Sequence, residues 1–139
     1  MLLNDDSWCS CTKCVSMETL KENVCCQSLM VPQLKELGDL PCITTHENFR
    51  SVVLLKETLW TSLVNMHDRE STSLPPRNNI PNKTLRYAAY RQFIWWVHCR
   101  LGRSVRRVIP SCVVKVIRST YQAPDGKYVV LRRGERKLI

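Results

Sequence analysis

The spacing of its cysteines constrains this chain more than any other feature. The chain has 139 residues and eight cysteines. Seven of them form a C-x-C-x2-C cluster, an adjacent pair and two single positions: Cys9, Cys11 and Cys14, then Cys25-Cys26, Cys42 and Cys112. Such short spacings suit the chelation of a metal by thiolates. The pattern therefore predicts a thiolate metal centre, with Cys99 outside it.

A disulfide scaffold is the alternative use of so many cysteines, and the cellular compartment separates the two. The first residues have no basic start, and Asn4-Asp5-Asp6 interrupts any apolar run, so no signal peptide is recognisable. The longest wholly apolar run, Phe93 to Val97, is far shorter than the roughly 20 residues of a membrane helix. We therefore expect a cytoplasmic protein without a membrane span, whose cysteines bind zinc.

The number of cysteines bears on the number of metals. Zinc in structural sites takes four thiolate or imidazole ligands in a tetrahedron, with no open position. Two tetrahedra that share one bridging thiolate need the seven cysteines that cluster here. One four-thiolate site with three spectator cysteines, helped by His46, is the alternative. The C-x-C element and the Cys25-Cys26 pair favour two zinc ions, because neighbouring thiols point to different sides.

Hydrophobic periodicity predicts a mainly α fold. We expect one small domain over residues 1–139, with about four to five helices arranged around the zinc centre. The helical pattern is strongest where Leu85, Ala89, Phe93 and Leu101 share one face. A proline-rich loop is expected over residues 68–81 and a flexible basic tail over residues 129–139. The expected helices run over residues 17–30, 33–40, 45–67 with a break near Val53, 83–101 and 110–121.

Charge is divided unevenly along the chain. Residues 1–76 carry six Lys/Arg and ten Asp/Glu, a net charge of −4, whereas residues 77–139 carry 15 and two, a net charge of +13. A cationic half favours an anionic partner such as a nucleotide, nucleic acid or acidic lipid, although a solvated basic surface is equally compatible. No catalytic motif accompanies it, since there is no phosphate-binding loop and no nucleophile-base set. We expect no enzymatic activity.

Five motifs occur in an order that resembles a known family. They are Trp8-Cys9-x-Cys11-x2-Cys14, Cys25-Cys26, Cys42-Ile43-Thr44-Thr45, Arg86-Tyr87-x-Ala89-Tyr90-Arg91 and Ile109-Pro110-Ser111-Cys112. Together they closely resemble the cytoplasmic C-terminal "ballast" domain of the P2X purinoceptors of subtype seven and related stand-alone proteins. The resemblance covers about Trp8 to Tyr128.

The resemblance implies two ligand sites. The first is a two-zinc centre on the seven cysteines given above. The second is a guanine-nucleotide site for GDP or GTP, to which the resemblance carries over Arg86, Tyr90 and Arg118. Three positions depart from the family pattern, because Tyr87, Val114 and Ala123 stand where it has histidine, arginine and lysine. From the residues alone, Arg107 or Lys115 would add a cation for a diphosphate, and Tyr87 or Tyr90 would stack on a purine.

Three functions follow as alternatives. The first is a zinc-stabilised intracellular regulatory module that binds guanine nucleotide weakly or not at all. The second is a protein-protein interaction scaffold with purely structural zinc. The third is a nucleic-acid-binding zinc protein, suggested by basic runs over residues 100–107 and 132–137. It ranks last because the chain has no finger, knuckle or ribbon spacing.

Overall fold

The computed structural model describes residues 8–28, 40–70, 74, 76–98 and 108–128, and within these it is mainly helical and has no strand. The mainly α prediction is therefore confirmed. In chain order the elements are the 3-10 helices η2 (Leu20–Glu22), η3 (Cys26–Ser28) and η4 (Ile43–Thr45), the π-helix η5 (Arg50–Leu54), α2 (Lys56–Glu70), the 3-10 helix η6 (Arg77–Asn79), α3 (Asn82–His98) and α4 (Ser111–Thr120).

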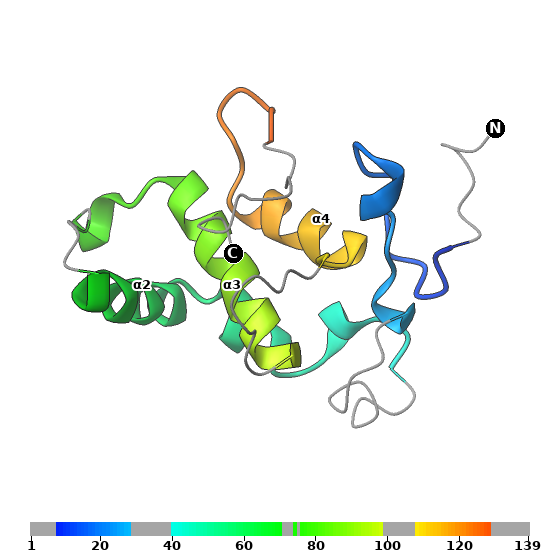
Figure 1. Ribbon diagram of the computed structural model, residues 1–139, viewed down its shortest axis with the longest axis horizontal. Coiled ribbons are helices and arrows are strands. Elements are labelled where there is room, and N and C mark those ends of the chain that lie inside the picture. Colours follow the sequence, from blue (N-terminus) through cyan, green and yellow to red (C-terminus); the bar gives the residue numbers. More distant parts are fainter. Residues whose placement is uncertain (1–7, 29–39, 71–73, 75, 99–107, 129–139) are drawn as a thin grey trace.

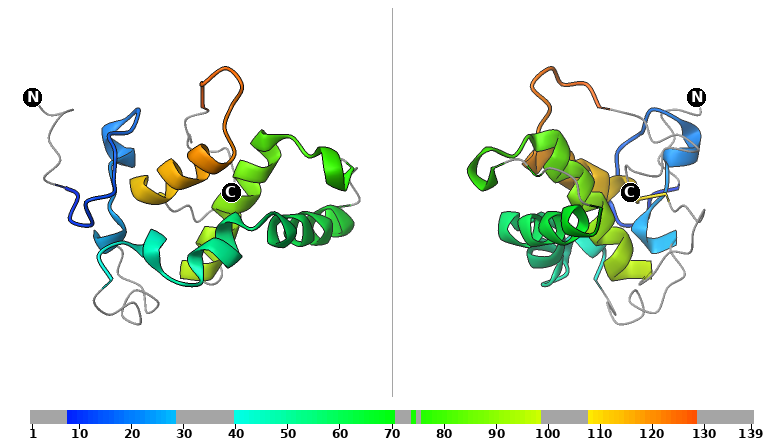
Figure 2. Two further views of the ribbon diagram at one scale, coloured as in Figure 1. Left: turned by 180° about the vertical axis from the view of Figure 1, so that it is seen from behind. Right: turned by 60° about the vertical axis from the view of Figure 1, so that its left-hand side comes forward.

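Helix α3 lies at the centre of the described fold. It packs against α2 and η5 on one side and against α4 on the other (Figures 1 and 2). The apolar face predicted for it is buried, since Leu85, Ala89 and Phe93 are each at most 1% exposed. Arg86 and Tyr90 are buried as well, although they lie off that face. A helix covered by neighbours on several sides buries more than one stripe.

The helix predicted over residues 45–67 is interrupted at Leu55, close to the predicted break near Val53, and this break separates η5 from α2. The amide of Leu55 donates to Arg50 O at 2.8 Å, which closes the π-helix, and Leu55 itself is extended, with ψ 124°. Side chains from other helices bind carbonyls on the N-terminal side of this break. Gln92 Nε2 donates to Val52 O at 3.2 Å, and the Tyr121 hydroxyl donates to Leu54 O at 2.5 Å. Tertiary donors thus stabilise the break.

The predicted helix over residues 17–30 is wrong. Its described part forms only the short turns η2 and η3. Asn23 Oδ1 accepts from the Met17 amide at 2.8 Å, and Val24 O accepts from the Ser111 amide at 2.8 Å. The bond from Ser111 uses a carbonyl, Val24 O, that a continuous helix would pair internally.

Other predicted elements agree with the structure or lie outside the described residues. Helix α3 matches the predicted helix over 83–101 as far as His98, and α4 matches the one over 110–121 as far as Thr120. Helix α2, by contrast, extends to Glu70, into the predicted loop over 68–81. The 33–39 part of the short 33–40 segment, the helix end at Leu101, Cys99 and the 129–139 tail lie outside the described residues. Within the described part, no helix has the length and apolar character needed to cross a membrane.

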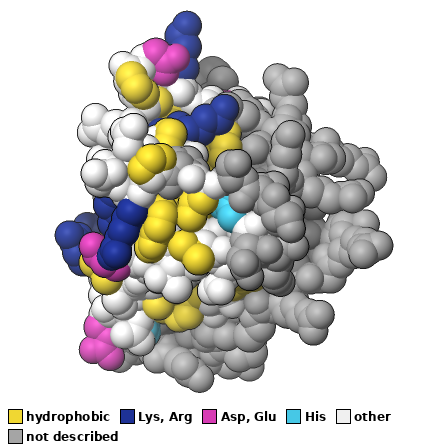
Figure 3. Space-filling view, turned by 90° about the vertical axis from the view of Figure 1, so that its left-hand side faces the viewer, with side chains coloured by type: hydrophobic (Ala, Val, Ile, Leu, Met, Phe, Trp, Pro, Cys, Tyr) yellow, Lys and Arg dark blue, Asp and Glu magenta, His cyan; other side chains and the backbone are white. Residues whose placement is uncertain are grey.

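The surface at the α2 end of the molecule is mixed in character. Figure 3 shows hydrophobic side chains gathered there among Lys, Arg, Asp and Glu side chains. Leu55 and Val64 are among the exposed apolar residues of this region, at 43% and 39%. Among the described residues on this face, both signs of charge are interspersed.

Candidate metal centre

Seven thiols from four separate segments converge on one side of α4. Cys9, Cys11 and Cys14 come from the N-terminal segment, where Thr12 reverses the chain with a left-handed φ of 69°. The others are Cys25 and Cys26 at the start of η3, Cys42 before η4, and Cys112 in the first turn of α4. All seven are free thiols.

These thiols form two groups of four that share Cys11. The outer group is Cys9, Cys11, Cys14 and Cys25, and the inner group is Cys11, Cys26, Cys42 and Cys112. Within each group all sulfur atoms lie within 4.8 Å of one another. A tetrahedral zinc site with Zn–S bonds of about 2.3 Å separates its sulfurs by about 3.8 Å. The observed Cys9–Cys11 and Cys11–Cys14 sulfur distances of 3.9 and 3.6 Å fit this geometry.

Neighbouring cysteines divide between the two groups. Cys25 belongs to the outer group and its neighbour Cys26 to the inner group, whereas Cys11 belongs to both. Soft thiolates in a tetrahedral arrangement select zinc or an iron-sulfur centre rather than magnesium or calcium. His46, considered above as an additional ligand, belongs to neither group: its Nδ1 accepts from the Asn48 amide at 3.0 Å.

Several polar groups orient the sulfur atoms. The Ile43 amide donates to Cys26 Sγ at 3.4 Å, and the Thr44 hydroxyl lies 3.0 Å from Cys42 Sγ. On the outer side, the Ser10 hydroxyl lies 3.9 Å from Cys25 Sγ. Such contacts fix ligand orientation and stabilise the thiolate form.

The pKa values of the thiols are strongly perturbed. Burial raises the pKa of Cys14 above its usual range. Burial acts in the same direction on Cys25, but hydrogen bonds from the backbone at Gln27, Ser10 and Cys11 bring its pKa down to about 6. Because a metal binds thiolates, its binding displaces the protons of the raised groups, and its affinity falls as pH falls.

Ser111 ties the N-terminal segment to α4 without using a thiol. Its side chain is fully buried; its Oγ accepts from the Val15 amide at 2.9 Å and donates to Val15 O. The Ser111 amide donates to Val24 O at 2.8 Å. Sequence analysis did not single out this residue, although its position beside Cys112 was a usable signal.

The described arginines and tyrosines that are candidates for nucleotide binding lie close to one another. The ring centre of Tyr128 lies 5.0 Å from Arg86 Cζ and 4.6 Å from Arg118 Cζ. Arg86 also donates to Tyr121 O at 2.9 Å, and Arg118 pairs with Glu18 at 3.2 Å. These cations therefore already have partners within the chain.

The remaining predicted residues are distributed around this cluster. Tyr87 and Tyr90 face each other with ring centres 6.3 Å apart. Burial raises the pKa of Tyr90, and the nearby Arg118 opposes that effect. Arg107 lies outside the described residues.

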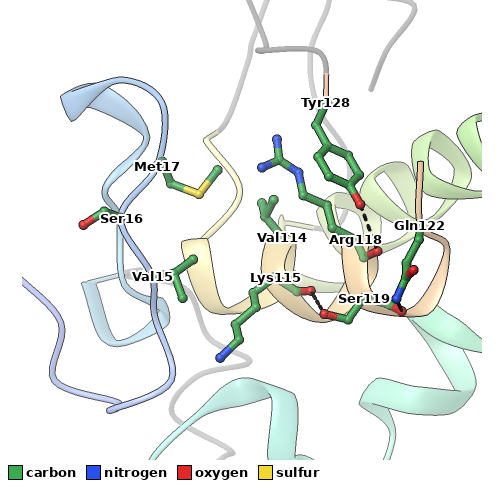
Figure 4. A pocket seen from close by; sticks show the side chains of 9 residues that line it. All are labelled: Val15, Ser16, Met17, Val114, Lys115, Arg118, Ser119, Gln122 and Tyr128. Carbon is green, nitrogen blue, oxygen red and sulfur yellow. Dashed lines mark hydrogen bonds between the residues drawn. The ribbon is translucent and has the colours of Figure 1, made fainter. Parts of the chain in front are cut away.

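A cavity of about 240 Å³ opens beside Arg118, between the N-terminal segment and α4 (Figure 4). Val15 and Met17 form its apolar side, and the Arg118 guanidinium lies near the Tyr128 ring. Lys115 supplies a second cation to the lining. The full lining is Val15, Ser16, Met17, Val114, Lys115, Arg118, Ser119, Gln122 and Tyr128.

Comparison with known proteins decides the family. The model of the P2X purinoreceptor 7 intracellular domain matches residues 3–132 of this chain. The chain belongs to this family. The resemblance inferred from the five motifs is thereby confirmed, and the intracellular description of the P2X purinoreceptor 7 domain agrees with the expected cytoplasmic location.

Two relatives extend the comparison. The chain is 27% identical to the P2X purinoceptor 7 of Rattus norvegicus over 126 residues, which cover 87% of the chain and 19% of the receptor. It is 27% identical to the P2X purinoceptor 7 of Mus musculus over 127 residues, which cover 88% of the chain and 19% of that receptor. The chain thus spans about a fifth of the length of these P2X purinoceptors. Both relatives are named as receptors, not as enzymes.

Proposed function

We propose that this domain is a non-enzymatic regulatory module whose fold is held together by two zinc ions bridged by Cys11. The observation that carries the proposal is the pair of four-thiol groups with one buried cysteine in common. Four sulfurs around each ion leave no open coordination position, so the metals would act structurally. The ligands come from segments far apart in the sequence, and metal binding would therefore contribute directly to folding.

Non-denaturing mass spectrometry of the purified chain tests this proposal. We expect a mass increase that corresponds to two zinc ions, with all seven cluster thiols reduced. A chain without metal and with its cysteines paired as disulfides would refute the proposal. A mass corresponding to an iron-sulfur cluster would support the same ligands but show that the metal is iron and not zinc.

A second candidate function is weak binding of guanine nucleotide beside Arg118. The cavity there supports it, because Lys115 and Arg118 are suitable partners for a phosphate group. The volume of about 240 Å³ is below the roughly 300 to 1,000 Å³ of most small-molecule sites. The Tyr128 ring also lines the cavity and lies close to both Arg86 and Arg118. A nucleotide would therefore compete with this ring for the two guanidinium groups.

Titration calorimetry with GDP and ADP separates this candidate from its alternatives. We expect GDP to bind more tightly than ADP and Arg118→Ala to weaken GDP binding by about tenfold or more. Arg77→Ala is the control, since Arg77 is exposed on η6 and lies over the Trp60 ring, on another element. Equal affinity of the Arg118→Ala and Arg77→Ala variants would exclude this site.

The other two functions predict different behaviour in the same experiments. A zinc-stabilised interaction scaffold would bind zinc but no nucleotide, and it would dock a protein partner. Nucleic-acid binding would instead weaken steeply with salt and tolerate many sequences. The basic runs that suggested it, over residues 100–107 and 132–137, lie entirely outside the described residues.

A further inference from the structure

The two thiol groups differ in their exposure to solvent. Every member of the inner group is buried. In the outer group, by contrast, Cys9 and Cys14 are only half-buried. A chelator or a competing thiol can therefore approach the outer group at Cys9 and Cys14 with less opening of the fold than the inner group requires.

The two groups also differ in what they hold together. The outer ligands all lie between Cys9 and Cys25, so a metal there closes only a short local loop. The inner ligands run from Cys11 to Cys112 and join the N-terminal segment, η3, the start of η4 and α4. A cross-link between distant segments restricts the unfolded chain more than a local one does. Loss of the inner metal should therefore have the larger effect on folding.

Hydrogen bonds that involve no metal fix the position of the residues that follow Cys14. Ser111 Oγ binds both backbone groups of Val15, and its amide binds Val24 O. The Met17 amide donates to Asn23 Oδ1 at 2.8 Å. Cys11 would remain a ligand of the inner metal. Removal of the outer metal would thus free little more than Cys9 and Cys14.

From these differences we infer that the outer group is an exchangeable zinc site, whereas the inner group is a permanent structural one. This inference rests on the proposed two-zinc centre and assigns the two ions different roles. Occupancy of the outer site would follow the zinc available around the domain and would set the order of residues 9–14. The rest of the described fold would stay intact.

Metal release tests the inference. The zinc-loaded chain is mixed with an excess of a chromogenic chelator, pyridylazoresorcinol, and followed by absorbance, non-denaturing mass spectrometry and far-ultraviolet circular dichroism. We expect one zinc to leave at least about tenfold faster than the other, because only the second release requires the fold to open. The one-zinc form should keep its helical signal. Release of both ions at one rate, or loss of helix with the first ion, would overturn the inference.

A pair of double variants locates the exchangeable site. Cys9→Ala/Cys14→Ala removes the two half-buried ligands and should leave one zinc and the wild-type helical signal. Cys26→Ala/Cys42→Ala removes the same number of thiols from the inner group and should abolish the helical signal. An outer variant without zinc or without helix would contradict the assignment, as would a folded inner variant.

The mass of the zinc-loaded wild-type chain, measured before the chelator is added, separates failure of this inference from failure of the proposed centre. Fewer than two zinc ions in that mass would refute the two-zinc proposal itself. Two ions that leave together would preserve the proposal and refute only the difference between the sites.

Discussion

Tyr121→Phe tests how the end of α4 is tied to the break before α2. The Tyr121 hydroxyl donates to Leu54 O at 2.5 Å, and both residues are buried, at 9% and 8% exposure. The substitution removes one oxygen and leaves the ring in place. Loss of a hydrogen bond to a buried acceptor costs about 1 to 2 kcal/mol. We therefore expect that reduction in the free energy of unfolding.

The expected change in melting temperature follows from the size of the chain. An unfolding entropy of about 2.1 cal/mol/K per residue gives roughly 0.3 kcal/mol/K for 139 residues. A loss of about 1 to 2 kcal/mol therefore corresponds to a decrease of about 3 to 7 °C in Tm. Differential scanning calorimetry in the presence of zinc measures it, and a parallel mass measurement verifies that the metal content is unchanged.

Tyr128→Phe is the matched control. The Tyr128 hydroxyl is half-buried and makes only long contacts, 3.3 Å from the Ala123 amide and 3.5 Å from Arg118 O. Its removal should lower Tm by much less than the removal of the Tyr121 hydroxyl. If both variants shift Tm equally, the bond to Leu54 O does not stabilise the break as argued.

Three further outcomes are expected. Phe93→Ala should lower the free energy of unfolding by about 3 to 5 kcal/mol in chemical denaturation, because Phe93 is fully buried in the core, whereas Trp95→Ala at a 41% exposed position should cost far less. Glu18→Gln should change stability by less than about 1 kcal/mol in the same assay, since its ion pair with Arg118 is partly exposed. Acidification should release zinc, measured by mass spectrometry across pH, because protons compete for thiols whose pKa is raised, such as Cys14; zinc content independent of pH would contradict thiolate ligation.

The predicted helices differ in accuracy for a physical reason. Helices α3 and α4 combine a long apolar period with clear boundaries, so local pattern and tertiary packing agree. The segment over 17–30 has a similar but weaker period, and there the Ser111 amide binds Val24 O, a carbonyl that a helix would pair internally. The sequence did predict a break near Val53, but not that Gln92 and Tyr121, which are distant in the sequence, bind the carbonyls beside it. Local patterns cannot show such donors.

Arg86, Tyr90 and Arg118 show the same limit of prediction from local sequence. Arg86 and Tyr90 lie off the predicted apolar face of α3, yet both are buried. The sequence identified residues suited to binding a nucleotide but not the partners that these residues already have in the folded chain. The ring of Tyr128 and the carboxylate of Glu18 meet these arginines only after the chain has folded.

The sequence by itself indicated the type of ligand and the principal helices. Seven clustered cysteines fix the type of ligand and favour two metals with a shared thiolate, and the apolar periods fix the principal helices. Only the tertiary structure decided that Cys11 is common to both groups and that one group is more exposed than the other. The reason is that ligand type is a property of the residue, whereas the sharing and burial of sulfur atoms depend on distances between segments as far apart as Cys11 and Cys112.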